Sequence, residues 1–162
     1  DPSMIEVIKA SGAGVIIMHM QENPQIMQED PKYKNVVQEV YDYLLERINA
    51  LTQLGVSRES IAVDPGIGFG KTTEHNIQLI THLNYLKKCG RPLVIGLSRK
   101  RFLGSLTGRK VNDRLAGSLG ALAFAILEGA NILRVHDVKE SNDVRKVISA
   151  LRKENLTHAI NK

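Results

Sequence analysis

The sequence has little cysteine, few aromatic residues and no long hydrophobic run. A single cysteine, Cys89, cannot form an internal disulfide or a cysteine metal cluster. Aromatic residues make up 4% of the chain and do not alternate with basic ones, which argues against nucleic acid as a partner. No segment approaches the roughly 18 consecutive apolar residues of a membrane span, and the first residues lack the layout of a secretory signal. We therefore expect a cytoplasmic protein with neither a membrane nor a nucleic acid as partner.

The remaining composition is that of a globular domain with a basic bias. Of the 162 residues 43% are apolar, which is enough for one domain with its own core. The net charge is +5, and basic side chains concentrate at residues 98–101 and 108–110. Such local clusters favour small anionic ligands.

Four short apolar runs alternate with longer amphipathic segments. The runs predict buried parallel strands at Val15 to Met20, Ile61 to Asp64, Leu93 to Ser98 and Ile132 to Val138. Helices are expected at residues 33–54, 75–88 and 113–128, and around the apolar positions Val144, Val147, Ile148 and Leu151. The order is therefore strand then helix, four times.

This order predicts the α/β class, with residues 1–162 as four βα units of a TIM (β/α)8 barrel. A complete barrel takes about 250 residues, so we expect this chain to be the C-terminal half of a barrel whose N-terminal half is absent. The opening agrees, because Asp1-Pro2 followed by Met4 and Ile5 is typical of a capped amphipathic helix with no strand before it. The strand count leaves one alternative open, a free-standing doubly wound sheet of four strands.

A glycine-rich loop follows the second apolar run, in the segment Asp64-Pro65-Gly66-Ile67-Gly68-Phe69-Gly70-Lys71. Ligands of parallel α/β folds bind at the carboxyl ends of the strands, and glycines let backbone amides approach them closely. The spacing matches neither the phosphate-binding P-loop nor the dinucleotide fingerprint. Lys71 is accordingly interpreted as a solvated residue at a helix start, outside the site.

The other strands also end in polar residues, which would meet on one rim of a barrel. These ends are Met18-His19-Met20, Ser98-Arg99-Lys100 and Arg134-Val135-His136-Asp137. Alternation along a strand places Arg134 and His136 on one face. The same alternation makes His19 point to the opposite face from Met18 and Met20, so His19 is interpreted as structural.

Each candidate side chain could bind a ligand or have only a structural role. Asp64 could accept two N–H groups from an amidine-like edge, or only cap its own loop. Arg134 and His136 together would form an anion clamp, whereas a metal at His136 lacks a second ligand at suitable spacing. Phe69 could stack on a ligand or pack in the loop, and Lys100 could point inward or lie in a solvated basic turn.

These four motifs, in this order, resemble the dihydropteroate synthase family. The resemblance covers nearly the whole chain and includes Asn23-Pro24 after the first strand and His75-Asn76 at a helix start. It implies a TIM barrel transferase of folate biosynthesis and a sulfonamide target. The implied reaction condenses 6-hydroxymethyl-7,8-dihydropterin pyrophosphate with para-aminobenzoate, and it yields 7,8-dihydropteroate and pyrophosphate.

The resemblance also implies a role for individual residues. Asp64 would bind the amino and ring N–H edge of the pterin, and Lys100 its carbonyl and ring nitrogen. Arg134 and His136 would bind the pyrophosphate. The implied catalytic residues are Lys100, Arg134 and His136; pterin contacts are Asp64, Met18, Gly96, Lys100 and Arg134; and para-aminobenzoate contacts are Phe69 and Ser98.

The resemblance further implies Mg²⁺, held mainly by the absent N-terminal half and by the substrate's pyrophosphate, and a homodimer built on the last helices. The chain alone is expected to be inactive, because half of the pocket would be missing. Two alternative functions remain open: a pterin-binding methyltransferase domain on a similar barrel, and a basic module that binds RNA through residues 98–110.

Overall fold

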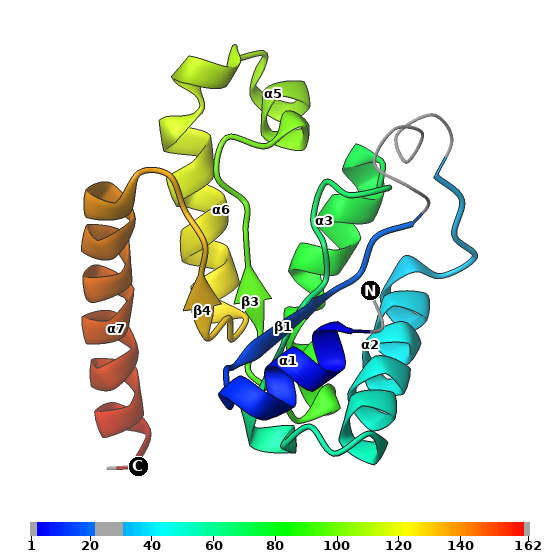
Figure 1. Cartoon of the computed structure of the whole chain (residues 1–162). Helices are drawn as coiled ribbons and strands as arrows, with labels where there is room; N and C mark the ends of the chain where they lie inside the picture. The colour runs from blue at the N-terminus through cyan, green and yellow to red at the C-terminus, as the bar shows by residue number, and fades with distance from the viewer. Residues whose placement is uncertain (1–2, 22–30, 161–162) are drawn as a thin grey trace.

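The computed structural model describes residues 3–21 and 31–160 and consists of parallel strands joined by helices (Figure 1). Its strands are β1 (Val15–Met18), β2 (Ile61–Asp64), β3 (Val94–Ile95) and β4 (Ile132–Leu133). Its α-helices are α1 (Met4–Ser11), α2 (Val36–Gln53), α3 (Thr73–Thr81), α4 (Leu83–Leu86), α5 (Arg101–Thr107), α6 (Leu115–Leu127) and α7 (Val138–Ile160). Three short 3₁₀ turns, η1 (Arg58–Ser60), η2 (Lys87–Cys89) and η3 (Val111–Asp113), complete it.

The four strands lie side by side in the order in which they occur in the sequence. β1 pairs in parallel with β2, from Val15 opposite Ile61 to Met18 opposite Asp64. A parallel bridge between Val63 and Leu93 links β2 to β3, and β3 pairs in parallel with β4. A doubly wound sheet reverses its strand order at a switch point, whereas the described strands show no reversal. An arc of a barrel has the same sequential order.

Helix α2 shows how the apolar pattern builds the core. Its buried side chains lie on the face that the sequence predicts: Val36, Val40, Leu44, Ile48 and Leu51. Asn35 caps its start, because the side-chain oxygen accepts the backbone N–H of Gln38 at 3.1 Å. This face packs toward β1 and α3, and the core continues through the buried residues of β2 and β3.

Several elements differ from the sequence prediction. The strands are shorter than expected, and Val138 begins α7 instead of ending β4. The helix expected at residues 75–88 breaks at His82, where the ring Nδ1 lies 2.8 Å from the carbonyl oxygen of Gln78 and the backbone leaves helical geometry. Helix α5 was not predicted. The expected cap at Asp1-Pro2 and the segment around Asn23-Pro24 lie outside the described residues.

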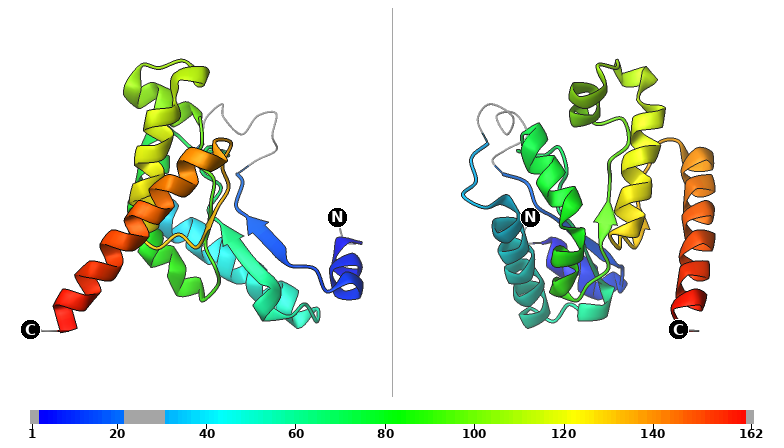
Figure 2. Two further views of the ribbon diagram at one scale, coloured as in Figure 1. Left: turned by 90° about the vertical axis from the view of Figure 1, so that its left-hand side faces the viewer. Right: turned by 180° about the vertical axis from the view of Figure 1, so that it is seen from behind.

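The two outer strands and helices expose apolar side chains. Ile16 on β1 is 54% exposed and Ile132 on β4 is 44% exposed. On α7 the expected core positions Val147 and Leu151 are 57% and 58% exposed, so only part of that apolar face is covered. Figure 2 shows α7 at the side of the molecule opposite the N-terminal helix α1. Among the described helices, none is long and apolar enough to cross a membrane.

Candidate functional site

Asp64 is the centre of the candidate site. It ends β2 and is 3% exposed. One carboxylate oxygen accepts the backbone N–H of Gly66 at 2.8 Å, and the other lies 3.4 Å from a guanidinium nitrogen of Arg134. A buried carboxylate needs such partners, because its desolvation otherwise favours the neutral acid. The ion pair to Arg134 joins the ends of β2 and β4 across the strand between them.

The glycine loop after Asp64 is held against the end of β1. Gly66 has φ +68°, and a Cβ added there would lie 1.8 Å from the carbonyl oxygen of His19. Only glycine allows this conformation and this approach together. Further along the loop, the N–H of Gly68 is bound by the side-chain oxygen of Asn76 at 2.7 Å, and the carbonyl of Gly70 by the hydroxyl of Tyr33 at 2.9 Å.

Lys100 reaches back over this loop from the end of β3. Its ammonium donates to the carbonyl of Ile67 and lies 4.2 Å from the centre of the Phe69 ring. Burial lowers the pKa of Lys100 to about 8, with Asp64 opposing that shift and Arg134 adding to it. Lys100 is therefore directed inward, which is the first of the two interpretations that the sequence left open. An ammonium over an aromatic ring is an attractive arrangement.

Lys71 is a second buried lysine, and its interpretation as a solvated residue is wrong. It is 3% exposed, with Nζ 2.9 Å from Nδ1 of His19 and 3.0 Å from the carbonyl oxygen of Phe69. Burial lowers the pKa of Lys71 to about 7, against the attraction of Asp64. Burial and the charge of Lys71 lower the pKa of His19 to about 4, so the imidazole is neutral near pH 7.

Arg134 and His136 follow β4 at the open side of the site. The guanidinium of Arg134 lies across Gly96, where an added Cβ would be 2.8 Å from Nη2. Both side chains are exposed, and the strand ends at Leu133. The buried strand expected from Ile132 to Val138 therefore does not extend to these two residues. Their exposure leaves the guanidinium and the imidazole accessible to an anion.

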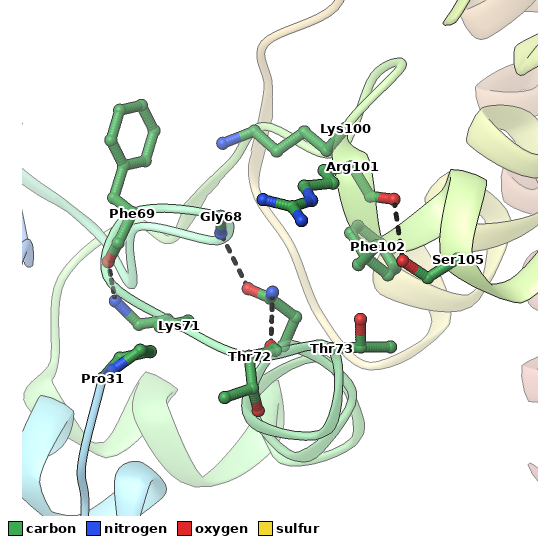
Figure 3. A pocket seen from close by; sticks show the side chains of 11 residues that line it. Pro31, Gly68, Phe69, Lys71, Thr72, Thr73, Lys100, Arg101, Phe102 and Ser105 are labelled. Atoms are coloured by element: carbon green, nitrogen blue, oxygen red, sulfur yellow. Dashed lines mark hydrogen bonds between the residues drawn. The ribbon is translucent and has the colours of Figure 1, made fainter. Parts of the chain in front are cut away.

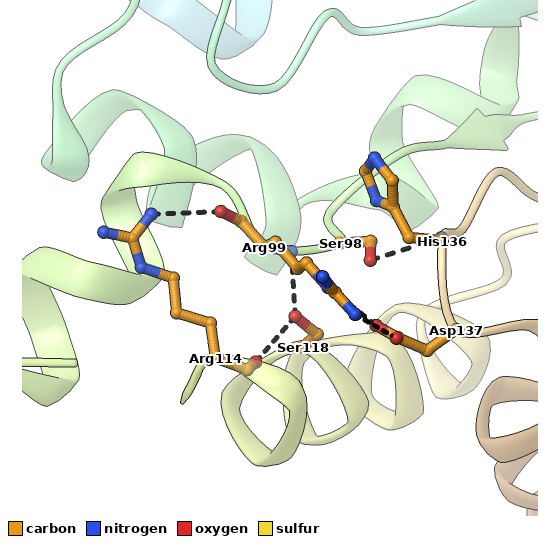
Figure 4. A network of polar contacts seen from close by, with 6 residues as sticks. All are labelled: Ser98, Arg99, Arg114, Ser118, His136 and Asp137. Carbon is orange, nitrogen blue, oxygen red and sulfur yellow. Dashed lines mark hydrogen bonds and ion pairs between the residues drawn. The ribbon is translucent and has the colours of Figure 1, made fainter. Parts of the chain in front are cut away.

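A network of polar contacts fixes the turn after β3 (Figure 4). The Oγ of Ser98 accepts the N–H of His136 at 3.4 Å. Arg99 has φ +57°, a left-handed conformation that is costly for a residue with a side chain. Its Nε donates to Asp137 at 3.1 Å, and its carbonyl accepts Nη1 of Arg114 at 3.0 Å. The network ties the turn carrying Lys100 to the segment carrying His136.

A cavity of about 540 Å³ opens beside these residues, between the glycine loop and the starts of α3 and α5 (Figure 3). Its lining includes the expected residues Phe69 and Lys100, whereas Ser98 faces His136 instead. Arg101, Thr72 and Lys71 add cationic and hydroxyl groups to the wall. The cavity can hold a ring against Phe69 with an acidic group among the cations.

The expected residues thus come from adjoining strand ends. Asp64, Lys100 and Arg134 are linked by direct contacts or charge, and Met18 lies opposite Asp64 in the strand pairing. Sequence reasoning gave no site role to the supporting residues Lys71, Asn76, Arg114 and Ser118. Lys71 and Asn76 stand in segments that carry the family resemblance, but nothing in the local sequence indicates the contacts that they make.

The donor set offers no ready-made metal site. Among the described side chains, those of residues 3–21 and 31–153, no three from His, Cys, Asp or Glu lie close enough together to hold a metal ion. The carboxylate of Asp64 is already engaged by Gly66 and Arg134. These residues therefore do not fit a protein-bound Mg²⁺ by themselves.

Comparison with known proteins assigns the class of this fold and site. The family model described as pterin binding enzyme matches residues 1–136. The chain therefore belongs to the pterin binding enzyme family.

Within that family the similarity is to dihydropteroate synthases. The chain is 41% identical over 150 residues to the dihydropteroate synthase of Escherichia coli K12, covering 93% of this chain and 53% of that protein. It is 42% identical over 154 residues to that of Neisseria meningitidis serogroup C, covering 93% and 54%. The chain thus spans about half the length of the curated relatives it matches.

Solved structures give the same result. A Yersinia pestis dihydropteroate synthase in complex with a sulfonamide drug aligns with a TM-score of 0.92 and 34% identity, over 95% of this chain and 56% of that one. A Xanthomonas albilineans dihydropteroate synthase in complex with 7,8-dihydropteroate aligns with a TM-score of 0.87 and 40% identity, over 94% and 55%. The α/β fold is thus shared with these enzymes.

Proposed function

We propose that this chain provides the C-terminal four βα units of a TIM barrel dihydropteroate synthase. The observation that carries the proposal is the buried carboxylate of Asp64 beside Lys100 and Arg134 at the carboxyl ends of three parallel strands. The relatives named above are dihydropteroate synthases, which favours this activity over a methyltransferase or an RNA-binding module.

The pterin would bind by its polar edges. Asp64 presents a carboxylate that can accept two parallel N–H groups from the amino and ring edge of the pterin. Arg134, which now contacts Asp64, would move aside or lie over the pterin ring. Lys100 would donate to the carbonyl and ring nitrogen. Met18 and Gly96 would line the ring faces, because Gly96 leaves the space in which Arg134 now lies.

The chemical step would be dissociative. The bond between the methylene carbon and the pyrophosphate oxygen breaks, and the electron pair leaves with the pyrophosphate. Arg134 and His136 would balance that charge. The amine of para-aminobenzoate, held near Phe69 in the cavity, then forms the new bond to the methylene carbon and gives a proton to the released pyrophosphate. Positioning and charge balance are the chain's contributions.

Two further parts of the proposal concern groups outside this chain. Mg²⁺ would be held by the substrate's pyrophosphate and by the other part of the barrel. We also propose a cytoplasmic homodimer built on the last helices, because Phe124 and Leu127 on α6 and Val147 and Leu151 on α7 are all more than 40% exposed. Catalysis is expected only from the complete barrel.

A calorimetric titration tests the pterin site. The complete polypeptide that contains residues 1–162 is titrated with 6-hydroxymethylpterin pyrophosphate and Mg²⁺, as wild type and as Asp64→Ala. Loss of a buried charged hydrogen-bond partner should weaken binding by about 100-fold. The control is Asp143→Ala, which removes an exposed carboxylate on α7 and should leave binding unchanged. Equal affinity of wild type and Asp64→Ala would contradict the proposal.

A further inference from the structure

Lys71 is a buried cation to which the proposed reaction gives no role. It follows the glycine loop directly and is 3% exposed. Within the part of the chain that the structure describes, its side-chain nitrogen makes two hydrogen-bond contacts, to Nδ1 of His19 and to the carbonyl of Phe69, and both are with neutral groups. A lysine is rarely buried without a carboxylate in contact, because loss of hydration disfavours the charged form.

The positions of His19 and Phe69 indicate what the buried Lys71 side chain does in the structure. His19 follows β1 and packs edge-on against Tyr43, with ring centres 5.0 Å apart. This packing holds the His19 ring in place beside β1. The amine of Lys71 carries at least two N–H donors in either protonation state, so it bridges two acceptors, the ring nitrogen of His19 and the main-chain carbonyl of Phe69. The bridge ties the outer end of the glycine loop to β1.

The end of the glycine loop that Lys71 holds contains Phe69, which lines the cavity. The Phe69 ring faces the ammonium of Lys100 at 4.2 Å, and both side chains line the 540 Å³ cavity (Figure 3). The inner end of the loop is fixed separately, by Asp64 at Gly66 and by Asn76 at Gly68. Loss of the Lys71 bridge would therefore free Phe69 while leaving the Asp64 edge in place.

We propose that Lys71 is a positioning residue for the arylamine: through His19 it fixes Phe69 against Lys100, and so sets the wall on which the arylamine ring lies. This inference rests on the proposed function. It assigns Lys71 an effect on one substrate only, because the pterin edge at Asp64 is held by other contacts.

Steady-state kinetics of the complete polypeptide, with each substrate varied, test this assignment. Lys71→Met keeps the length of the side chain and removes the donor. In this variant the KM for para-aminobenzoate should rise about tenfold, the effect of one lost hydrogen bond, while the KM for the pterin substrate changes less than about twofold. Lys71→Arg should recover part of the loss. His19→Phe, which removes the acceptor, should act in the same direction. Lys146→Met, an exposed lysine on α7, is the matched control.

Amide hydrogen exchange gives a second readout that does not depend on turnover. In Lys71→Met the amides of residues 66–70 should exchange faster, and most of all that of Phe69. Unchanged exchange, or equal changes in both KM values, would overturn the positioning role. An inactive wild type would count against the proposed function instead, and hydrogen exchange would still decide the role of Lys71.

Discussion

The buried ammonium of Lys71 makes the stability of the protein depend on pH in a way that one substitution can isolate. Lys71 faces the neutral His19 ring, the attracting carboxylate of Asp64 and the repelling ammonium of Lys100, and burial is the largest cause that lowers its pKa to about 7. In the unfolded chain a lysine has a pKa of about 10.4. Between these values the unfolded state binds more protons than the folded one.

Folding stability should therefore rise with pH in this window. Below pH 7 both states hold the proton, and the cost of burying the charge is fully present. As pH rises above 7 the folded protein releases the proton and that cost declines, until the unfolded chain also titrates. For a single lysine with these pKa values, the free energy of unfolding should increase by about 2.5 kcal/mol from pH 6 to pH 9.

Urea unfolding of the complete polypeptide at pH 6, 7.5 and 9 measures this increase. Lys100, with a pKa of about 8, titrates in the same window with the same sign. It is present in both proteins, so the difference between wild type and Lys71→Met isolates Lys71. The exposed-lysine variant Lys146→Met should parallel wild type. If wild type and Lys71→Met also change in parallel, within about 0.5 kcal/mol, the reasoning is refuted.

Two other substitutions test the framework of the site. Gly66→Ala should destabilise the fold by more than about 3 kcal/mol, because it combines a left-handed φ with a clash against the carbonyl of His19; chemical denaturation measures the loss. Arg114→Met should destabilise by about 2 kcal/mol and lower kcat, because it leaves the carbonyls of Arg99 and Lys100 without the donor that holds the strained turn; denaturation and steady-state kinetics measure the two effects.

Each of these variants has a matched control in the chain. Gly108 has φ +70° but nothing within 4 Å of an added Cβ, so Gly108→Ala should cost only about 1 kcal/mol. Arg145 is an exposed arginine whose side chain bonds to Asn142, three positions earlier on the same helix, so Arg145→Met should be neutral. Equal losses of stability in Gly66→Ala and Gly108→Ala would contradict the steric argument for Gly66. An unchanged kcat in Arg114→Met would contradict the role of Arg114 in holding the turn.

The apolar pattern of the sequence was sufficient to predict the strand and helix order, because each strand run and the face of α2 are set by burial. Two features of the helices do not follow from periodicity. The break at His82 depends on side chains that bond nearby carbonyls, and α5 depends on the left-handed turn at Arg99, which nothing in the local sequence requires. The sequence predicts strands that are too long, because apolar residues continue past the last pair of residues that is hydrogen-bonded between strands.

The candidate site was predictable where a residue type is unusual for its place, and not where its role depends on distant partners. Asp64 and its glycines stand at a strand end, which the sequence makes visible. The burial of Lys71 depends on His19, 52 positions away, and on a loop that folds back over the lysine. A motif mismatch correctly excluded a P-loop, but it could not tell whether the lysine is solvated.

The exposed outer strands have a practical consequence. Ile16 on β1 and Ile132 on β4 mark two parallel edges, and the residues of the site extend from strand ends between them. A separately produced amino-terminal piece of a related enzyme could dock on both edges without disturbing Asp64, Lys100 or Arg134. On the proposed function, mixing the two pieces should restore activity, and the activity regained would report their affinity for each other.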